Sequence, residues 1–174
     1  MAPPRIDSRS AFEAVFREHY EALARFAFRF TRDAAAAEDI VQEAFGRLWT
    51  ERHSIDITTS LRAYLYTAVR NRALNISTHA SVVDAFELDP SAVESIGSAP
   101  AQPDEVLDVA ELHARLAEAF EALPEKQATA MRLRWQDELT YAEIAHTLGI
   151  SIKGVEKHLS RGLAALRDRL AKFR

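Results

Sequence analysis

The chain has 174 residues, no cysteine and a net charge of −4 at pH 7, and 48% of its residues are hydrophobic. The absence of cysteine excludes disulfides and thiolate metal sites and fits a reducing compartment. No apolar stretch reaches the ~18 residues that a membrane span needs, and the charged N-terminus has no signal-peptide core, so we expect a soluble, cytoplasmic protein without membrane insertion.

Charge is distributed unevenly along the chain. Residues 84–111 contain eight Asp or Glu and no Lys or Arg, a local charge of −8, whereas residues 151–174 contain seven Lys or Arg against two acids, a local charge of +5. A basic end is the electrostatic pattern expected of a nucleic-acid binder. The acidic middle has two interpretations: it folds back onto the basic end, or its three prolines keep it extended.

Apolar residues at helical spacing predict three helices in the first 80 residues. Asp33 and Ser60 can cap the second and third of these, because their short polar side chains accept from the free N–H groups of a first helical turn. The three apolar stripes, in chain order, are Phe12, Phe16, Tyr20, Leu23 and Phe30; Ile40, Val41, Ala44, Phe45, Leu48 and Trp49; and Leu61, Tyr64, Leu65, Ala68, Val69 and Leu74.

Prolines, serines and a glycine predict a linker at residues 84–104, which separates a first domain (8–83) from a second (105–174). Four helices are predicted in the second domain. Their apolar stripes are Val106, Val109, Leu112, Leu116 and Phe120; Ala128, Met131 and Trp135; Ile144 and Leu148; and Val155, Leu159, Leu163, Leu166 and Leu170. The fold class expected from these patterns is all-α, with two small helical domains.

The last two predicted helices carry the most specific local signal, TYAEIAHTLGISIKGVEKHLSRGLAALRDRL. Thr140 and Glu143 form a capping box, Gly149 permits a tight left-handed turn, and Ser151 can cap the last helix. Two helices joined in this way predict a helix-turn-helix, whose second helix enters the DNA major groove. The alternative is an ordinary helical hairpin with a solvated basic face.

The residues at the start of the last helix are those that would meet DNA. Lysine and arginine there can contact phosphates or guanine edges, and glutamate can accept from cytosine. The candidate DNA-contacting residues are Ser151, Lys153, Glu156, Lys157, Ser160 and Arg161, with Ile152 among them on the exposed side.

These motifs resemble a known family at three places. The helix-turn-helix resembles region 4 of sigma factors, which reads the −35 promoter element. AAAAEDIVQEAFGRLW resembles the region 2 helix that docks on the coiled coil of the polymerase β′ subunit, and SLRAYLYTAVRNRALN resembles the helix that handles the −10 element. Region 2, linker and region 4 together form the reduced architecture of extracytoplasmic-function (ECF) sigma factors. Within this family, the segment GISIKGVEKHLSRGL is most similar to sigma factors of the iron-uptake type. The resemblance to the family as a whole covers roughly residues 10 to 170.

The resemblance implies a protein that binds RNA polymerase core through the β′ coiled coil and the β flap and directs it to promoter DNA. It also implies an anti-sigma factor, which in this family is often membrane-tethered. Asp39, Gln42 and Glu43 would contact β′; from the residues alone, an ordinary solvated helix face is the preferred interpretation. The residues that match −10 contacts are Tyr64, Tyr66, Arg70, Asn71 and Asn75, with Tyr64 also fitting a core position.

The chain departs from the family after Asn75. Relatives carry several Lys or Arg there, whereas this chain continues ISTHASVVDAFELD, which is uncharged and then acidic. Phosphate anchoring near the −10 element is therefore expected to be weaker than in relatives.

Two other function classes fit the sequence less well. A response-regulator output domain has a similar helix-turn-helix, but it needs a receiver domain of alternating strands and helices, and the first domain shows only helical periodicity. An enzyme is disfavoured because the six histidines have no metal-ligand spacing and no phosphate loop or nucleophile motif occurs. We therefore expect no metal, no cofactor and no catalysis by the chain itself.

Overall fold

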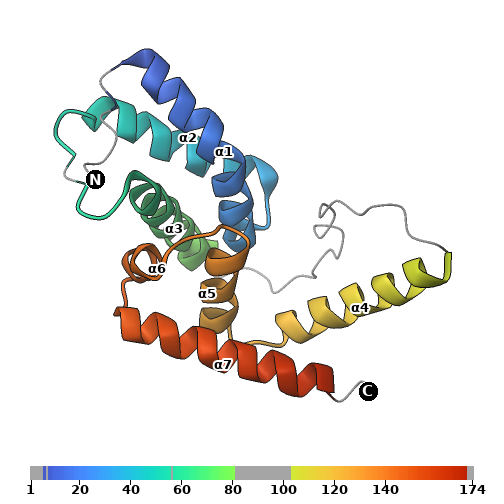
Figure 1. Ribbon diagram of the computed structural model, residues 1–174. Coiled ribbons are helices and arrows are strands. Elements are labelled where there is room, and N and C mark those ends of the chain that lie inside the picture. The colour runs from blue at the N-terminus through green and yellow to red at the C-terminus, as the bar shows by residue number, and fades with distance from the viewer. Residues whose placement is uncertain (1–5, 7, 56, 81–102, 172–174) are drawn as a thin grey trace.

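The computed structural model describes residue 6 and residues 8–55, 57–80 and 103–171, with the backbone alone for 77–80 and 103–110. This described part is all helical, as expected, and contains no strand. The helices are α1 (Arg9–Thr31), α2 (Ala34–Glu51), α3 (Leu61–Ala80), α4 (Pro103–Glu121), α5 (Glu125–Trp135), α6 (Tyr141–Leu148) and α7 (Ile152–Ala171). Their arrangement is shown in Figure 1. Most of the predicted linker lies outside the described residues, so the two interpretations of the acidic middle stay predictions.

Short polar side chains fix where four of the helices begin. Ser8, Asp33, Ser60 and Ser151 each accept a hydrogen bond from the backbone N–H three residues later, at 2.8 to 3.2 Å. Each bond satisfies one of the donors that a first helical turn leaves free, so these residues favour the helix starts at the observed positions. The three caps predicted from the sequence are confirmed, and Ser8 is a fourth.

Helices α1, α2 and α3 form the N-terminal domain. Phe12 and Phe16 of α1 meet Phe45 and Trp49 of α2, with ring centroids 4.8 to 6.0 Å apart. Phe45 is buried and the other three are half-buried, and these aromatic contacts join α1 to α2. Helix α3 buries more than the single predicted stripe, because Tyr66 and Ala73 are buried as well as Leu65 and Val69.

Helices α4 to α7 form the C-terminal domain, in which α5 and α6 pack against the long α7. The fully buried side chains there include Leu133, Leu139, Ile144 and Val155. Helix α7 approaches α5 closely at Gly162, where an added Cβ would lie 2.3 Å from the sulfur of Met131.

Four residues of the predicted apolar stripes are exposed. Helix α4 packs on α7 through its last turns, where Ala119 and Leu123 are buried, so the preceding turns project beyond the bundle. The exposed residues are Leu112, Leu116 and Leu163, together with Trp135 at the C-terminal end of α5. Stripe periodicity places these residues on one face of a helix, but it does not say how far a neighbouring helix extends over that face.

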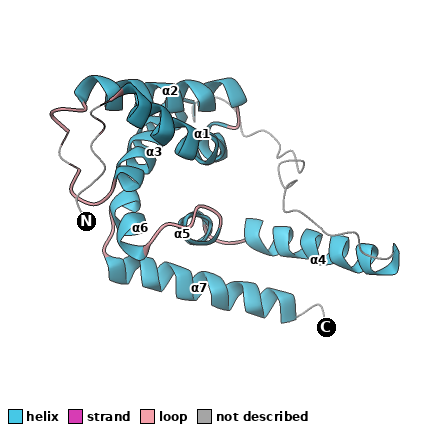
Figure 2. Ribbon diagram, turned by 45° about the horizontal axis from the view of Figure 1, so that its top comes forward, coloured by secondary structure: helices cyan, strands magenta, loops and turns pink. Residues whose placement is uncertain are grey.

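The two domains lie against each other. In Figure 2, α1 to α3 lie at the top of the view and α7 at the bottom, with α5 and α6 between them and α4 extending to the right of α5. Helix α6 packs directly on α3, and the buried apolar residues of both domains belong to one continuous cluster. This contact explains why α3 is buried on two sides.

Two glycines give a matched test of the backbone at the turn. Gly149 has φ = 66°, and Gly46 lies in mid-helix on the exposed side of α2; neither has an atom within 4 Å of an added Cβ. Gly149→Ala is expected to lower the free energy of unfolding by about 1–2 kcal/mol because of the left-handed backbone. Gly46→Ala is expected to raise it by about 0.5–1 kcal/mol. Urea unfolding measures both, and equal effects of the same sign would contradict this reading of the turn.

Candidate nucleic-acid and polymerase interfaces

The helix-turn-helix predicted from the sequence is present in α6 and α7. The Thr140 hydroxyl accepts from the Glu143 N–H at 3.3 Å, and the Glu143 carboxylate accepts from the Thr140 N–H at 2.9 Å, which completes the capping box. At the other end of α6, Gly149 is left-handed and the Ile150 N–H donates to the Ala145 carbonyl at 3.0 Å. These bonds hold the turn between the two helices.

The start of α7 presents its polar side chains outward. Val155 and Leu159 are buried against α5 and α6, which turns the opposite side of the helix toward solvent. All six candidate DNA-contacting residues are exposed: Ser151, Lys153, Glu156, Lys157, Ser160 and Arg161. The geometry therefore allows this helix face to enter a groove. His158 points elsewhere, since it is half-buried and its Nδ1 has no hydrogen-bond partner among the described residues.

The candidate −10 residues on α3 are divided between surface and interior. Asn71 and Asn75 are exposed, and Tyr64 and Arg70 are half-buried. Tyr66, by contrast, is only 1% exposed and packs on Phe26 with ring centroids 5.0 Å apart, so DNA cannot reach it in this arrangement.

The Tyr66 hydroxyl lies at the boundary between the domains. Burial, and secondly the nearby carboxylate of Asp137, raise the pKa of this phenol well above its ordinary value. The hydroxyl has no well-aligned hydrogen bond among the described residues. Tyr66 is therefore a packing residue of the closed arrangement.

The acid-and-amide face of α2 is exposed as predicted. Asp39, Gln42 and Glu43 lie opposite the buried Ile40 and Ala44. The carboxylate of Glu43 also pairs with the guanidinium of Arg72 on α3 at 2.7 Å. Both of these side chains are at least half exposed, so their ion pair contributes about 0–1 kcal/mol and leaves the face available to a partner.

A set of polar contacts between the domains was not predicted from the sequence. We call it the closed interface: Arg29, Ser60, Arg62 and Thr67 of the N-terminal domain against Gln136, Asp137, Glu143 and His146 of the C-terminal domain. Its partners are 75 to 108 residues apart along the chain, and no local motif connects them. The only signal in the sequence was a polar loop before α6, which also fits an ordinary turn.

Asp137 lies at the centre of the closed interface. Its carboxylate accepts from the Arg29 guanidinium at 3.0 Å, and its backbone carbonyl accepts from Arg62. The Asp137 side chain is 2% exposed and that of Arg29 is 21% exposed, so this pair is largely removed from water. The second amino group of Arg29 donates to the side-chain oxygen of Gln136 at 2.9 Å.

Glu143 connects the capping box to the closed interface. The Ser60 hydroxyl donates to its carboxylate at 2.7 Å. Burial alone would raise the pKa of Glu143, but the hydrogen bonds from Ser60 and Thr140 outweigh it and hold the pKa below its ordinary value. Nearby, the Thr67 hydroxyl and the His146 ring nitrogen are 3.1 Å apart. The start of the helix-turn-helix is thus hydrogen-bonded to α3.

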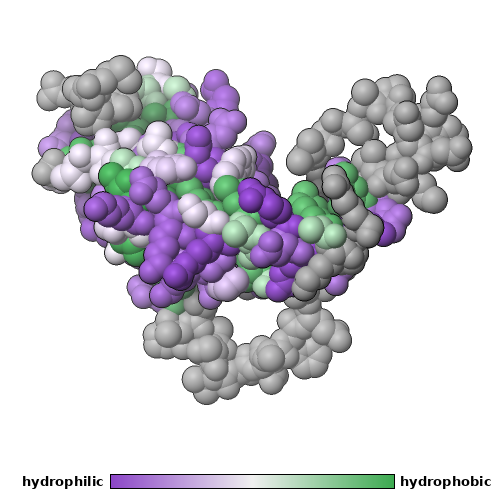
Figure 3. Space-filling view, turned by 60° about the horizontal axis from the view of Figure 1, so that its bottom comes forward, coloured by the Kyte–Doolittle hydropathy of each residue, from purple (hydrophilic) through white to green (hydrophobic). Residues whose placement is uncertain are grey.

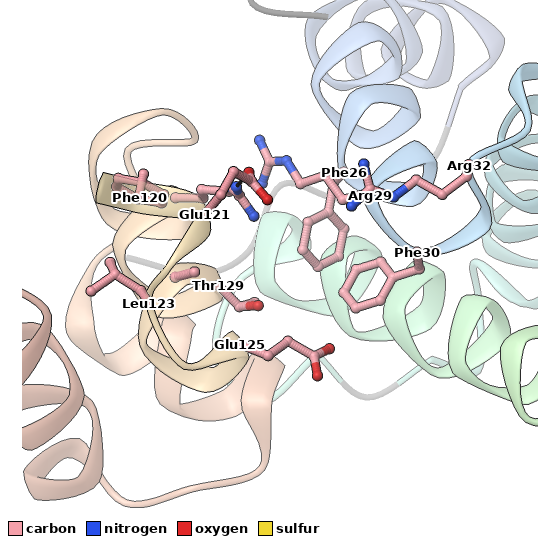
Figure 4. Close-up of a pocket in the computed structure, with 11 residues that line it drawn as sticks. Phe26, Arg29, Phe30, Arg32, Phe120, Glu121, Leu123, Glu125 and Thr129 are labelled. Atoms are coloured by element: carbon pink, nitrogen blue, oxygen red, sulfur yellow. Dashed lines mark hydrogen bonds and ion pairs between the residues drawn. The ribbon is translucent and has the colours of Figure 1, made fainter. Parts of the chain in front are cut away.

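A cavity of about 220 Å³ lies beside the closed interface, between α1 on one side and α4 and α5 on the other (Figure 4). Three arginines line it, but Arg29 is paired with Asp137, and Arg132 is paired with Glu121 at 2.7 Å. Burial, opposed by Glu121 and assisted by Arg29, lowers the pKa of Arg132. Because two of its three cations already have acid partners, we interpret the cavity as a packing gap between the domains.

Within the residues that the structure describes, no three His, Asp or Glu side chains gather as a metal site would require. None of the described helices combines the length and the apolar character needed to cross a membrane.

Comparisons with known proteins agree with the two-domain reading. Residues 15–80 match Sigma-70 region 2, and residues 113–166 match Sigma-70, region 4. The chain is 32% identical over 158 residues to the ECF RNA polymerase sigma factor SigL of Mycobacterium tuberculosis (strain H37Rv), covering 88% of this chain and 85% of SigL. The chain belongs to the ECF sigma factors of the sigma-70 family. Proteins of this family direct RNA polymerase to promoters and are not themselves enzymes. The response-regulator alternative is wrong, because the first domain is a sigma region 2.

Two further relatives support this sigma factor assignment, and one solved structure shows the same fold. FecI, the ferric citrate uptake sigma factor of Escherichia coli K12, is 28% identical over 87% of this chain and 86% of its own. The probable sigma factor RfaY of Xanthomonas campestris is 32% identical over 83% of this chain, but the chain spans only 36% of its length. The sigma factor RpoE of Bartonella quintana, solved with the anti-sigma factor NepR, has the same fold (TM-score 0.63, 21% identity, 94% of this chain and 98% of that one).

The exposed basic side chains of α7 generate a test of −35 reading by this sigma factor. Lys157→Ala or Arg161→Ala is expected to weaken promoter binding by about 1–3 kcal/mol if the residue reads a base. A phosphate contact would instead weaken binding to all sequences alike and lower the salt slope by about one. Fluorescence anisotropy against promoter and scrambled duplexes at several salt concentrations distinguishes the two.

Arg167→Ala is the matched control for this test, because Arg167 is an exposed arginine on the later part of the same helix. It should bind as the unaltered protein does. Unchanged binding by both the Lys157 and Arg161 variants would remove this face of α7 from the DNA.

Proposed function

We propose that this chain binds RNA polymerase core through the exposed face of α2 and reads promoter DNA at two places, the −10 element with α3 and the −35 element with α7. The observation that carries the proposal is the exposed basic face of α7, held by a fully capped helix-turn-helix in a chain that also has a region 2. The polymerase supplies the chemistry, so the chain acts without a cofactor. We infer that it acts in the cytoplasm, where the polymerase and the chromosome of a bacterium are found.

The polymerase contact rests on charge and exposure. Asp39 and Glu43 carry negative charge on the outer side of α2, and Gln42 between them can donate and accept hydrogen bonds. This combination suits a basic coiled-coil surface such as the family attributes to β′. Complementary charge of this kind chiefly speeds association and fixes the orientation of the partners.

The −10 contact is proposed for the surface members of the α3 set. Asn71 and Asn75 are exposed and carry amides that can hydrogen-bond a base edge, while Arg70 can meet a phosphate. Tyr64 is half-buried on the same helix and can offer part of a ring for stacking. Tyr66 would join this set only if the C-terminal domain moved away from α3.

The exposed apolar residues of the C-terminal domain are proposed as a protein contact. Leu112 is 57% exposed on α4, with Leu116 one turn later and Leu163 exposed on the adjoining α7. Figure 3 shows a mainly hydrophilic face on which hydrophobic residues gather toward the α4 end. An apolar patch with a polar rim is typical of a protein-binding surface, and the β flap and an anti-sigma factor are the partners that the family offers. RpoE, solved with NepR, supports the anti-sigma proposal.

The iron-uptake subtype stays a prediction. FecI is among the relatives, but its 28% identity does not exceed the 32% of SigL, so overall similarity does not favour iron uptake over another stimulus. The amino-acid sequence of α7 is the only feature that supports the iron-uptake subtype.

Charge reversal tests the polymerase contact. Asp39→Lys combined with Glu43→Lys should abolish association with core, because it places two cations against a basic surface. The matched control is Glu18→Lys combined with Glu21→Lys, which makes the same change of charge on exposed positions of α1. Co-purification with core, with circular dichroism to confirm helix content, measures the effect. Normal recovery of core with the α2 variant would mean that the docking surface lies elsewhere.

Promoter-directed transcription tests the function as a whole. Core polymerase reconstituted with the chain is expected to start transcripts at a small set of genomic positions that share sequences near −10 and −35. Sequencing of transcript 5′ ends reveals them. Starts that are identical with and without the chain would contradict a sigma function.

A further inference from the structure

One ion pair joins the two surfaces of region 2 that the proposed function assigns to different partners. The Glu43 carboxylate, on the α2 face proposed for polymerase, accepts from the Arg72 guanidinium of α3 at 2.7 Å. Arg72 lies on α3 between Asn71 and Asn75, the exposed members of the −10 set. Both partners of the pair keep at least half of their side-chain surface exposed, so another molecule can reach either one.

Arg72 is suited to bind a DNA phosphate. Its Nε donates to Glu43, whereas its two terminal amino groups make no hydrogen bond to any described residue. In the sequence, no Lys or Arg follows Arg72 until Arg115. The cations beside Asn71 and Asn75 are therefore Arg70, which is half-buried, and Arg72, which is exposed. Because phosphate binding depends on positive charge, Arg72 is the most accessible anchor on this part of α3.

The ion pair opposes both of the contacts proposed for its members. A carboxylate that is held by Arg72 is less available to a basic surface of polymerase. A guanidinium beside the Glu43 carboxylate attracts a phosphate less strongly, because the two opposite charges largely cancel at the phosphate. Polymerase and DNA therefore each compete with the ion pair, and binding of either one releases the group that the other needs.

We propose that Arg72 is a further DNA-contacting residue of region 2, and that docking of Glu43 on polymerase frees its guanidinium for a promoter phosphate. The proposal rests on the proposed function, since it needs both partners. Coupling between two binding contacts is reciprocal, so promoter DNA strengthens the polymerase contact by the same factor. The coupling cannot exceed the strength of the pair itself, which for an exposed ion pair limits the factor to about fivefold.

Removal of the arginine should strengthen association with core polymerase. Arg72→Gln releases Glu43, so the variant is expected to bind core up to about fivefold more tightly in the absence of DNA. Titration of the fluorescently labelled chain with core measures this affinity. In a Glu43→Gln background the same change should have no further effect, because no carboxylate is then released. Arg25→Gln is the matched control, since it breaks an exposed pair with Glu21 on α1 and should bind core as the unaltered chain does.

The same variant should weaken the promoter complex. Polymerase carrying the Arg72→Gln chain is expected to bind all −10 sequences more weakly, with a salt slope lower by about one, because a phosphate contact has been lost. Arg72→Lys should restore the salt slope, since it keeps the charge. Fluorescence anisotropy with a labelled duplex that contains a start site found by 5′-end sequencing measures both quantities. Arg25→Gln again serves as the control and should leave them unchanged.

The outcomes separate the two claims. If the unaltered chain neither joins core nor selects a promoter, the proposed function is wrong. If it does both, but Arg72→Gln binds core no more tightly than the unaltered chain, the competition for Glu43 is wrong. An equal gain in the Glu43→Gln background would assign the effect to general charge and would likewise overturn the proposal. An unchanged salt slope for the Arg72→Gln complex would remove Arg72 from the DNA.

Discussion

Between α1, α3 and the loop that precedes α6, the carboxylate of Asp137 accepts from Arg29 while its backbone carbonyl accepts from Arg62. A carboxylate that is 2% exposed is tolerated only with partners of this kind, because its hydration has been lost. The loop is therefore fixed relative to α1 and α3 of region 2. Thr140, which begins the capping box of α6, follows three residues later, so the helix-turn-helix is held at a defined position against α3.

The contact between the domains determines which of the candidate recognition surfaces are exposed. The −35 candidates on α7 and the polymerase candidates on α2 are exposed in the closed form, whereas α3 is partly covered by α6. A single chain thus presents one of its two candidate DNA-reading helices and holds part of the other in its interior.

Sequence reasoning succeeded where the cause is local. The caps by Asp33, Ser60 and Ser151 and the left-handed turn at Gly149 follow from chemistry within three or four residues, and each is present. The exposed candidates on α7 followed from periodicity, because the buried residues of a helix determine which side remains outside. The candidates on α2 came from the family resemblance.

The failures have a common physical reason. Leu112 and Trp135 fit an apolar stripe, but their exposure depends on where a neighbouring helix ends, which periodicity does not encode. Tyr66 matched a DNA-contact position, yet it is buried against Phe26 and lies near Asp137, which is 71 positions away in the chain. The closed interface as a whole depends on contacts between distant residues, so neither propensity nor motif could predict it.

The distance between the two domains tests the account most directly. With no native cysteine, spin labels can be attached at Thr50→Cys on α2 and Arg167→Cys on α7, both exposed and outside the proposed contact faces. Pulsed electron resonance should give one narrow distance for the free protein and an increase on the order of tens of ångströms in the complex with core and promoter. The reason is that the −10 and −35 elements, separated by roughly 25 base pairs at about 3.4 Å per pair, are ~85 Å apart. A broad distribution of long distances in the free protein, or an unchanged distance in the complex, would contradict it.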